Sequence, residues 1–166
     1  MWSHGHFGLA ALCAALPVYL AGRLIHPVAG VLILVFSLSV ANFPDSVERT
    51  FGAAHRGMGH TVLFAVVVAS ILGVITWGVH AGSDALPWKP TTTTILVAGG
   101  SFVGICSHLL GDVITFGGEY RVKPWWPVKR RSYQLEWTTS SNQLWNKGFL
   151  VLGVAAQILS FLGVLV

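Results

Sequence analysis

Two short stretches of this sequence place metal-binding residue types beside long apolar runs. In C-S-H-L-L-G-D, His108 and Asp112 lie four residues apart near the end of one such run. Residues four apart project from the same face of a helix, so one imidazole nitrogen and one carboxylate oxygen can meet a single ion. This mixed set of donors suits zinc, with manganese or iron as alternatives. Taken alone, the pair is explained slightly better as a hydrogen-bonded contact between helices.

The second stretch, H-R-G-M-G-H, precedes another apolar run. His55 and His60 are about 140° apart on an ideal helix, so a continuous helix cannot direct both to one ion. Gly57 and Gly59 allow the backbone to bend, which predicts that His55 and Arg56 lie in a turn and that His60 opens the next helix. A helix N-terminus favours anions, which suits a phosphate held between Arg56 and a metal ion. Contact with lipid head groups explains Arg56 equally well.

Polar residues with similar chemistry occur in two further segments. A-N-F-P-D-S-V-E ends one apolar run and presents Asp45 and Glu48, although Asp45 could simply cap a turn. His6 lies in S-H-G-H-F, where the first apolar run begins. Ionisable groups are costly to keep within a membrane bundle. The convergence of four separate segments on one layer therefore favours a metal site over isolated polar contacts.

The loop E-Y-R-V-K-P-W-W-P-V-K-R-R-S-Y combines aromatic rings with basic residues. This combination suits the head-group layer of a membrane. Ordinary anchoring explains Lys129 to Arg131 best, whereas Arg121 and Lys123 are candidates for binding a substrate. Asn142 and Asn146, four residues apart, are candidates for capping or supporting hydrogen bonds.

Composition identifies the elements that must position these residues. The chain has 166 residues, of which 54% are hydrophobic and only 10% charged, against about 25% charged in a typical soluble domain. A soluble bundle would have too few polar residues to cover its surface. Five stretches without charge are each close to the ~20 residues that cross a bilayer as a helix. We therefore predict an all-α, polytopic integral-membrane helical bundle, formed by residues 1–166 as a single domain. The five predicted transmembrane helices are Phe7–Leu24, His26–Ala41, Thr61–His80, Thr93–Ile114 and Phe149–Val166.

Charge predicts how this bundle is oriented. With five spans, eight basic residues fall on the side of the N-terminus and two, Arg23 and Lys89, on the other side. The eight are Arg49, Arg56, Arg121, Lys123, Lys129, Arg130, Arg131 and Lys147. Positive residues accumulate in cytoplasmic loops. The bias therefore places the N-terminus and the metal-binding residue types at the cytoplasmic side of the cell (inner) membrane, and the net charge of +4 requires no nucleic-acid partner.

The order of these motifs resembles a known family. G-H near the N-terminus, P-D after the second run, H-R-G-x-x-H, S-H-L-L-x-D and a later W-P with basic residues resemble the membrane-bound metal-dependent hydrolases of the YdjM type, described as LexA-regulated inner-membrane proteins. The resemblance covers about Gly5 to Gly148. That family is distantly similar in its His and Asp pattern to zinc-dependent phospholipase C.

The resemblance implies a set of site residues. The implied ligands of a divalent metal, zinc above all and manganese as the alternative, are His6, Asp45, His60, His108 and Asp112. His55 is implied as a further ligand or an acid/base group. Val47 stands where the family usually has a second Asp, which leaves open whether Glu48 replaces that carboxylate. Gly59 stands where the family usually has Thr.

The combined prediction is a metal-dependent hydrolase that acts at the cytoplasmic membrane interface on a phosphoester or phosphodiester of a lipid head group. Its ion would lower the pKa of a bound water towards ~7. The candidate catalytic residues are His55, Asp45 and Glu48, and the candidate substrate-binding residues are Arg56, Arg121 and Lys123. The alternative is a non-catalytic membrane subunit with a structural metal site and a basic loop that docks a partner. A transporter is less favoured because no span has a charged midplane residue or an obvious repeat.

Overall fold

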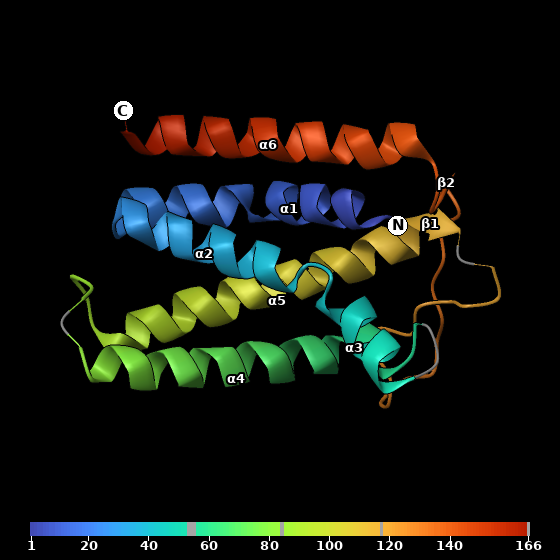
Figure 1. Cartoon of the computed structure of the whole chain (residues 1–166), viewed down its shortest axis with the longest axis horizontal. Coiled ribbons are helices and arrows are strands. Elements are labelled where there is room, and N and C mark those ends of the chain that lie inside the picture. Colours follow the sequence, from blue (N-terminus) through green and yellow to red (C-terminus); the bar gives the residue numbers. More distant parts are fainter. Residues whose placement is uncertain (53–55, 84, 117, 166) are drawn as a thin grey trace.

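The computed structural model describes residues 1–52, 56–83, 85–116 and 118–165, and within these ranges the chain is almost entirely helical (Figure 1). The helices are α1 (Ser3–Leu24), α2 (Pro27–Val40), α3 (Phe43–Phe51), α4 (Val62–Ala81), α5 (Pro90–Ile114) and α6 (Gln143–Leu165). A 3-10 turn, η1 (Met58–His60), precedes α4. Two short strands, β1 (Thr115–Phe116) and β2 (Thr138–Thr139), pair in parallel between α5 and α6.

Five helical segments are long and apolar enough to cross a membrane, with α2 and α3 forming one of them. This confirms the predicted all-α bundle of about five membrane helices. The N- and C-termini lie at opposite ends of the bundle, as an odd number of spans requires (Figure 1).

Three helices begin earlier than the apolar runs indicated. α1 starts at Ser3, α5 at Pro90 and α6 at Gln143, because their first turns use polar residues that hydropathy alone does not assign to a span. At α6 the Asn142 side-chain oxygen accepts hydrogen bonds from the backbone N–H groups of Leu144 and Trp145. Such an N-cap stabilises a helix start that contributes no apolar surface.

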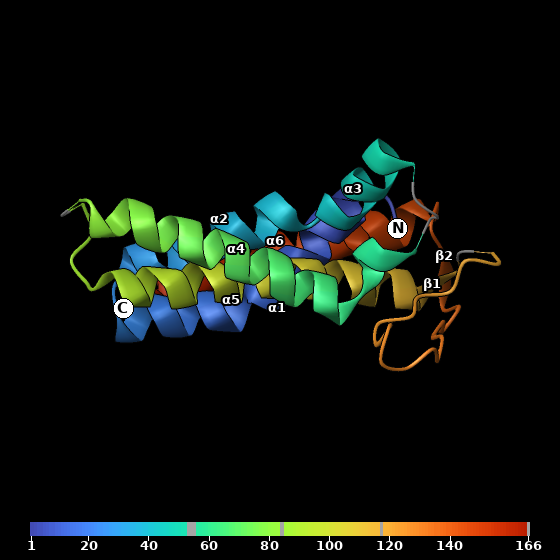
Figure 2. The ribbon, with the colours of Figure 1, turned by 90° about the horizontal axis from the view of Figure 1, so that it is seen from below.

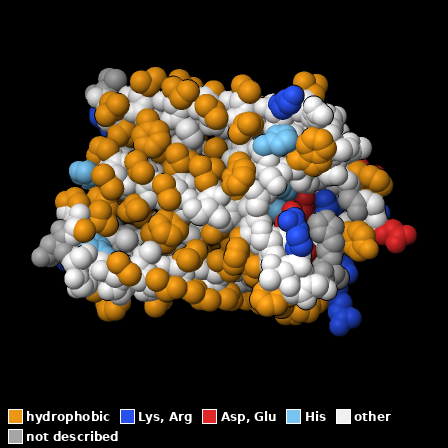
Figure 3. All heavy atoms as spheres, in the orientation of Figure 1, with side chains coloured by type: hydrophobic (Ala, Val, Ile, Leu, Met, Phe, Trp, Pro, Cys, Tyr) orange, Lys and Arg blue, Asp and Glu red, His pale blue; other side chains and the backbone are white. Residues whose placement is uncertain are grey.

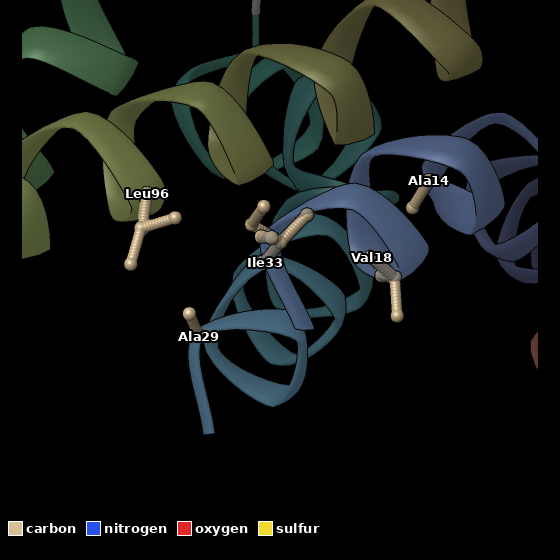
Figure 4. Packing of buried hydrophobic residues seen from close by; sticks show 6 residues of the cluster. Ala14, Val18, Ala29, Ile33 and Leu96 are labelled. Atoms are coloured by element: carbon tan, nitrogen blue, oxygen red, sulfur yellow. The ribbon is translucent and has the colours of Figure 1, made fainter. Parts of the chain in front are cut away.

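α5 is the central helix of the bundle, since it is the most buried of the five spans, whereas α4 and α6 are the least buried. Figure 4 shows part of the core, where Ala14 and Val18 of α1, Ala29 and Ile33 of α2, and Leu96 of α5 pack together. Many apolar side chains lie on the face of the helices that Figure 3 shows, and large apolar residues of all five spans are exposed. A surface of this kind is stable against lipid tails and not against water.

Glycines set how closely α5 approaches α2. A Cβ atom built on Gly100 or Gly104 would collide with the α2 backbone at Ile33 or Ser37. Small residues of this kind allow membrane helices to pack backbone against backbone. Gly8 and Gly153 play the same part between α1 and α6. The close α2–α5 contact matters for the site, because the same face of α5 continues into His108 and Asp112.

One end of the bundle carries α3, β1, β2 and the N-terminus, and the α4–α5 connection lies at the other end (Figure 2). The segment after β1 is tied back to the helices by its backbone. Val62 N–H donates to Pro124 O, Tyr133 N–H to Val122 O, and Leu135 N–H to Val113 O. These bonds fix the basic, aromatic loop against the start of α4 and the end of α5.

Candidate metal centre

α5 contributes two donors from its glycine-lined face. Gly100, Gly104, His108 and Asp112 follow one another at intervals of four, so they form one stripe along the helix. Because the glycines bring α2 close, the His108 Nδ1 atom reaches the backbone oxygen of Ala41 at 2.7 Å. This bond directs the opposite ring nitrogen, Nε2, away from α2 and toward the interior of the site.

α3 contributes Asp45. The sequence indicated that this segment ends the second apolar run, and the structure has a short helix there, with Pro44 in its first turn, where a missing N–H costs nothing. Asp45 and Glu48 are three residues apart and share one face of this helix. Both carboxylates therefore point toward His60.

His60 comes from η1. The prediction that His60 opens the following helix differs from the structure, in which His60 ends the 3-10 turn and Thr61 is the N-cap of α4. The Thr61 hydroxyl accepts a hydrogen bond from Phe64 N–H. His60 thus lies just before α4 begins, and its ring is fully buried in the site.

Four side chains from α3, η1 and α5 bring one donor atom each to a common centre. His60 Nε2 lies 3.0 Å from Asp112 Oδ2, 3.3 Å from Asp45 Oδ1 and 3.1 Å from His108 Nε2. His108 Nε2 lies 3.5 Å from Asp45 Oδ1 and 3.6 Å from Asp112 Oδ2. All four atoms lie within 4.8 Å of one another. We call Asp45, His60, His108 and Asp112 the metal cluster.

These five distances, 3.0–3.6 Å, are close to those expected around a metal ion. Ligands about 2.0–2.2 Å from a tetrahedral zinc ion lie roughly 3.3–3.6 Å from one another. Asp45 Oδ1 and Asp112 Oδ2 are buried and have no hydrogen-bond partner of acceptable geometry within the described residues. Buried oxygens without partners are unfavourable unless a cation satisfies them. The metal cluster thus fits a divalent ion, and two imidazoles with two carboxylates are donors that zinc and manganese accept.

Groups behind the two histidines orient them. Glu48 Oε1 lies 2.9 Å from His60 Nδ1, and Ala41 O accepts from His108 Nδ1. A carboxylate or carbonyl on the outer ring nitrogen fixes the tautomer in which the inner nitrogen carries the lone pair. Both rings are therefore set to bind through Nε2. Glu48, which the sequence offered as a catalytic candidate, lies behind His60 in this structure.

The carboxylates around His60 favour the protonated form of its ring when no metal ion is bound. Burial by itself lowers the pKa of His60, but the close carboxylates of Asp112, Asp45 and Glu48 outweigh burial and raise this pKa to about 10. The protonated His60 ring therefore supplies positive charge to the surrounding carboxylates when no metal ion does so. A divalent ion satisfies the same carboxylates and competes with that proton.

His6 lies beside the cluster and is not one of its four members. Its ring is fully buried and stacks on His108 with centroids 3.8 Å apart, and its Nε2 atom is 3.6 Å from Asp112 Oδ1. Neither of its ring nitrogens has a hydrogen-bond partner within the described residues. The structure therefore brings His6 to Asp112, and whether it binds an ion stays a prediction.

Arg56 connects the cluster to a pocket. Its Nη2 atom is 3.3 Å from Asp112 Oδ1, and its Nη1 donates to Tyr120 O at 2.9 Å. Arg56 has a left-handed backbone, φ 59°, which is strained for a residue with a side chain. A hydrogen bond from Arg56 N–H to Glu48 Oε2, 2.8 Å long, holds this conformation. The buried guanidinium is thus fixed between the metal cluster and the loop.

The pocket on the other side of Arg56 has a volume of about 460 Å³ and is lined in part by Arg56, Arg121, Lys123 and Trp126. We call it the cationic pocket. The three basic residues are those that the sequence offered as substrate-binding candidates, and the fold brings them together. Figure 3 shows acidic, basic and histidine side chains gathered near the end of the bundle that carries α3, on an otherwise apolar face.

The structure also identifies contributors that the motifs did not indicate. Among these are the Ala41 carbonyl, Gly104 and Thr115, whose hydroxyl lies 3.4 Å from Arg56 Nη2. The four-residue interval from Gly100 to Asp112 was the available signal for the α2 contact. Backbone carbonyls leave no signal in a sequence. His55 lies outside the described residues.

A family model described as "YdjM inner membrane protein" matches residues 1–165. No curated protein and no solved structure matches the chain.

Proposed function

Since this chain belongs to the YdjM inner membrane protein family and brings four metal-binding side chains to one centre, we propose that it is a membrane-bound metal-dependent hydrolase. Its substrate is a phosphoester or phosphodiester of a lipid head group, cleaved at the cytoplasmic face of the membrane. The observation that carries the proposal is Arg56, which contacts Asp112 of the metal cluster and also lines the cationic pocket. A binding site for an anion thus adjoins a site for a divalent ion.

The metal cluster would hold the ion through Asp45, His60, His108 and Asp112. When bound there, a divalent ion acts as a Lewis acid and lowers the pKa of a bound water. Zinc is the first candidate and manganese the second, because both accept imidazole together with carboxylate.

Residues of the chain would supply substrate binding and proton transfer. Arg56, Arg121 and Lys123 offer cationic donors to a phosphate, and guanidinium groups bind phosphate oxygens in pairs. Asp45 is the cluster member with the most exposed side chain, at 24%. Its carboxylate has a second oxygen that can accept a proton from the reacting water. Both Glu48 oxygens already contact His60 and Arg56, which favours a positioning role for Glu48.

The cytoplasmic orientation is part of the proposal. The basic residues that predict it lie in α3, between α3 and η1 (Arg56), in the loop after β1 and at the start of α6. These segments are at the end of the bundle that carries the metal cluster (Figure 1). The positive-inside rule therefore supports a site that faces the cytoplasm.

A screen of a total lipid extract tests the hydrolase. The wild-type protein and His60→Ala are incubated with the extract and added zinc or manganese, and products are identified by mass spectrometry. We expect release of phosphate or a phosphorylated head group, which chelation stops and which His60→Ala lowers at least ~100-fold. His80→Ala is the matched control. His80 is also buried, but it lies in the last turn of α4, at the end of the bundle away from the metal cluster, where its ring contacts Thr93 of α5.

Metal content is measured in parallel by elemental analysis. We expect His108→Ala and Asp112→Ala each to lose the bound ion, whereas His80→Ala retains it. Full metal occupancy in the wild type, with no product in any lipid class, would instead support the non-catalytic subunit with a structural metal site. Retention of the ion in both cluster variants would remove His108 and Asp112 as ligands.

A further inference from the structure

A second cavity adjoins the cationic pocket and has the opposite chemistry. It has a volume of about 410 Å³ and is lined mainly by apolar and aromatic side chains, among them Trp125, Pro127 and Tyr133 of the loop and Val62 and Leu63 of α4. We call it the aromatic groove. Trp126 lines both cavities, so the two meet at this residue.

We propose that the cationic pocket and the aromatic groove bind one amphiphilic substrate, a lipid phosphate whose head group occupies the pocket and whose acyl chain occupies the groove. Trp126 is the specificity-determining residue, since it separates the polar from the apolar subsite. The inference rests on the proposed function and adds a subsite for the acyl chain of that lipid, which selects a phosphate ester with a long apolar chain over a water-soluble phosphoester.

The charge of the pocket fits a phosphate. Its lining residues include three basic ones, Arg56, Arg121 and Lys123, and one acidic one, Glu119. The Arg56 Nε atom is buried and has no hydrogen-bond partner among the described residues, while its two other guanidinium nitrogens are engaged. Because this atom is buried, the cationic groups that line the pocket for a phosphate are those of Arg121 and Lys123, and the fixed Arg56 guanidinium adds positive charge beside them.

The groove is positioned to receive a chain from the bilayer. Val62 and Leu63 begin α4, which is one of the five candidate membrane spans. The outward face of α4 continues with apolar, exposed Val66 and Val67. An acyl chain can therefore pass from the lipid along α4 into the groove without crossing water.

The two cavities are held in a fixed relation by the backbone. Val62 N–H donates to Pro124 O at 2.8 Å, which ties the loop to the first residue of α4. The Tyr120 carbonyl accepts from Arg56, which ties the same loop to the metal cluster. A head group and a chain bound on either side of Trp126 thus reach a defined position relative to the cluster.

Binding is measured by calorimetry on the zinc-loaded full-length protein in nanodiscs. The probes are glycerol 3-phosphate and phosphonate analogues of dibutyryl and dihexanoyl phosphatidic acid. In these analogues a methylene group replaces the oxygen between glycerol and phosphorus, so that the phosphorus cannot be released by hydrolysis. Each methylene buried in an apolar site strengthens binding up to about fourfold. We therefore expect the dihexanoyl analogue to bind at least ~50-fold more tightly than glycerol 3-phosphate.

Variants separate the two subsites. Trp126→Ala should weaken the dihexanoyl analogue at least ~10-fold and leave glycerol 3-phosphate within about twofold, because the indole offers an acyl chain a large apolar surface and carries no charge that attracts the phosphate. Trp137→Ala is the matched control, since Trp137 is an exposed tryptophan of the same loop that lines neither cavity. Arg121→Ala should weaken all three probes alike, whereas Arg130→Ala, outside both cavities, should weaken none.

Two results would overturn the inference. One is equal affinity for glycerol 3-phosphate and the dihexanoyl analogue. The other is an equal effect of Trp126→Ala and Trp137→Ala, which means that the aromatic loop only anchors the protein in the head-group layer. Turnover of the corresponding esters is measured separately. Hydrolysis of short and long esters at the same rate contradicts the inference alone, whereas chain-dependent binding without any hydrolysis contradicts the proposed function.

Discussion

Glu48 offers the sharpest test of how the metal cluster is built. Its two carboxylate oxygens accept from two donors at once, His60 Nδ1–H at 2.9 Å and Arg56 N–H at 2.8 Å. Glu48→Gln keeps the shape of the side chain but replaces one oxygen with an NH2 group. That group can satisfy neither donor, so either His60 or Arg56 then faces another donor.

The magnitude follows from these two contacts. Glu48 is 4% exposed, so water does not replace a lost bond. A buried hydrogen bond to a charged group contributes about 1.5–3 kcal/mol, which corresponds to roughly 10- to 150-fold in an equilibrium constant. Loss of a carboxylate behind a metal-binding histidine typically weakens metal binding ~10–100-fold. We expect the zinc dissociation constant of Glu48→Gln to rise by that factor.

The assay is competition of the purified protein with a chelator of known zinc affinity. Glu136→Gln is the control, because it removes the same charge from an exposed site that no metal-cluster residue contacts among the described residues. Zinc affinity of Glu48→Gln within about threefold of wild type would refute the positioning role. If turnover were then lost at full zinc occupancy, Glu48 would be a catalytic residue as the sequence suggested.

Three further predictions follow from the structure. Gly104→Ala places a Cβ against the Ser37 backbone oxygen and should separate α2 from α5, so that zinc affinity falls at least ~10-fold although no ligand has changed. The control is Gly99→Ala, whose Cβ meets nothing within 4 Å and which should leave zinc affinity unchanged. Equal zinc affinities of the two variants would show that the α2–α5 contact does not hold His108. With its pKa raised to about 10, the His60 ring is protonated at pH 7 in the ion-free protein. Zinc binding should then displace about one proton from His60, and zinc affinity should strengthen as the pH rises toward about 10. Calorimetry in buffers of different ionisation enthalpy measures this release, and zero protons at pH 7 would contradict the cluster electrostatics. A reporter fused to the C-terminus should be active outside the cytoplasm and one inserted at Ser132 inside it; a cytoplasmic C-terminus would contradict the proposed orientation.

Much of the fold could be predicted from the sequence, because a membrane span is a local property. Twenty apolar residues without charge cross the hydrocarbon whatever surrounds them, so five spans followed from composition alone. The ends of the helices did not follow. α6 starts six residues before the predicted Phe149, since Asn142 caps it with a hydrogen bond that hydropathy does not measure.

Part of the candidate site was also visible in the sequence. The interval between His108 and Asp112 fixed their common face on a helix, and the residue types indicated zinc or manganese. The motifs named Asp45 and His60 as well. All four belong to the metal cluster that the structure assembles.

The sequence by itself determined that the protein resides in a membrane, how many spans it has and which kinds of atom could bind an ion, because each depends on residue type and on spacing within one helix. Only the tertiary structure decided which atoms meet. Glycines at the α2–α5 contact bring the Ala41 carbonyl to His108. The short α3 directs Glu48 to the back of His60, and Glu48 also accepts from the backbone of Arg56, which lies between Asp112 and the cationic pocket. These contacts join residues from separate segments, and their geometry depends on how helices pack, which no local pattern specifies.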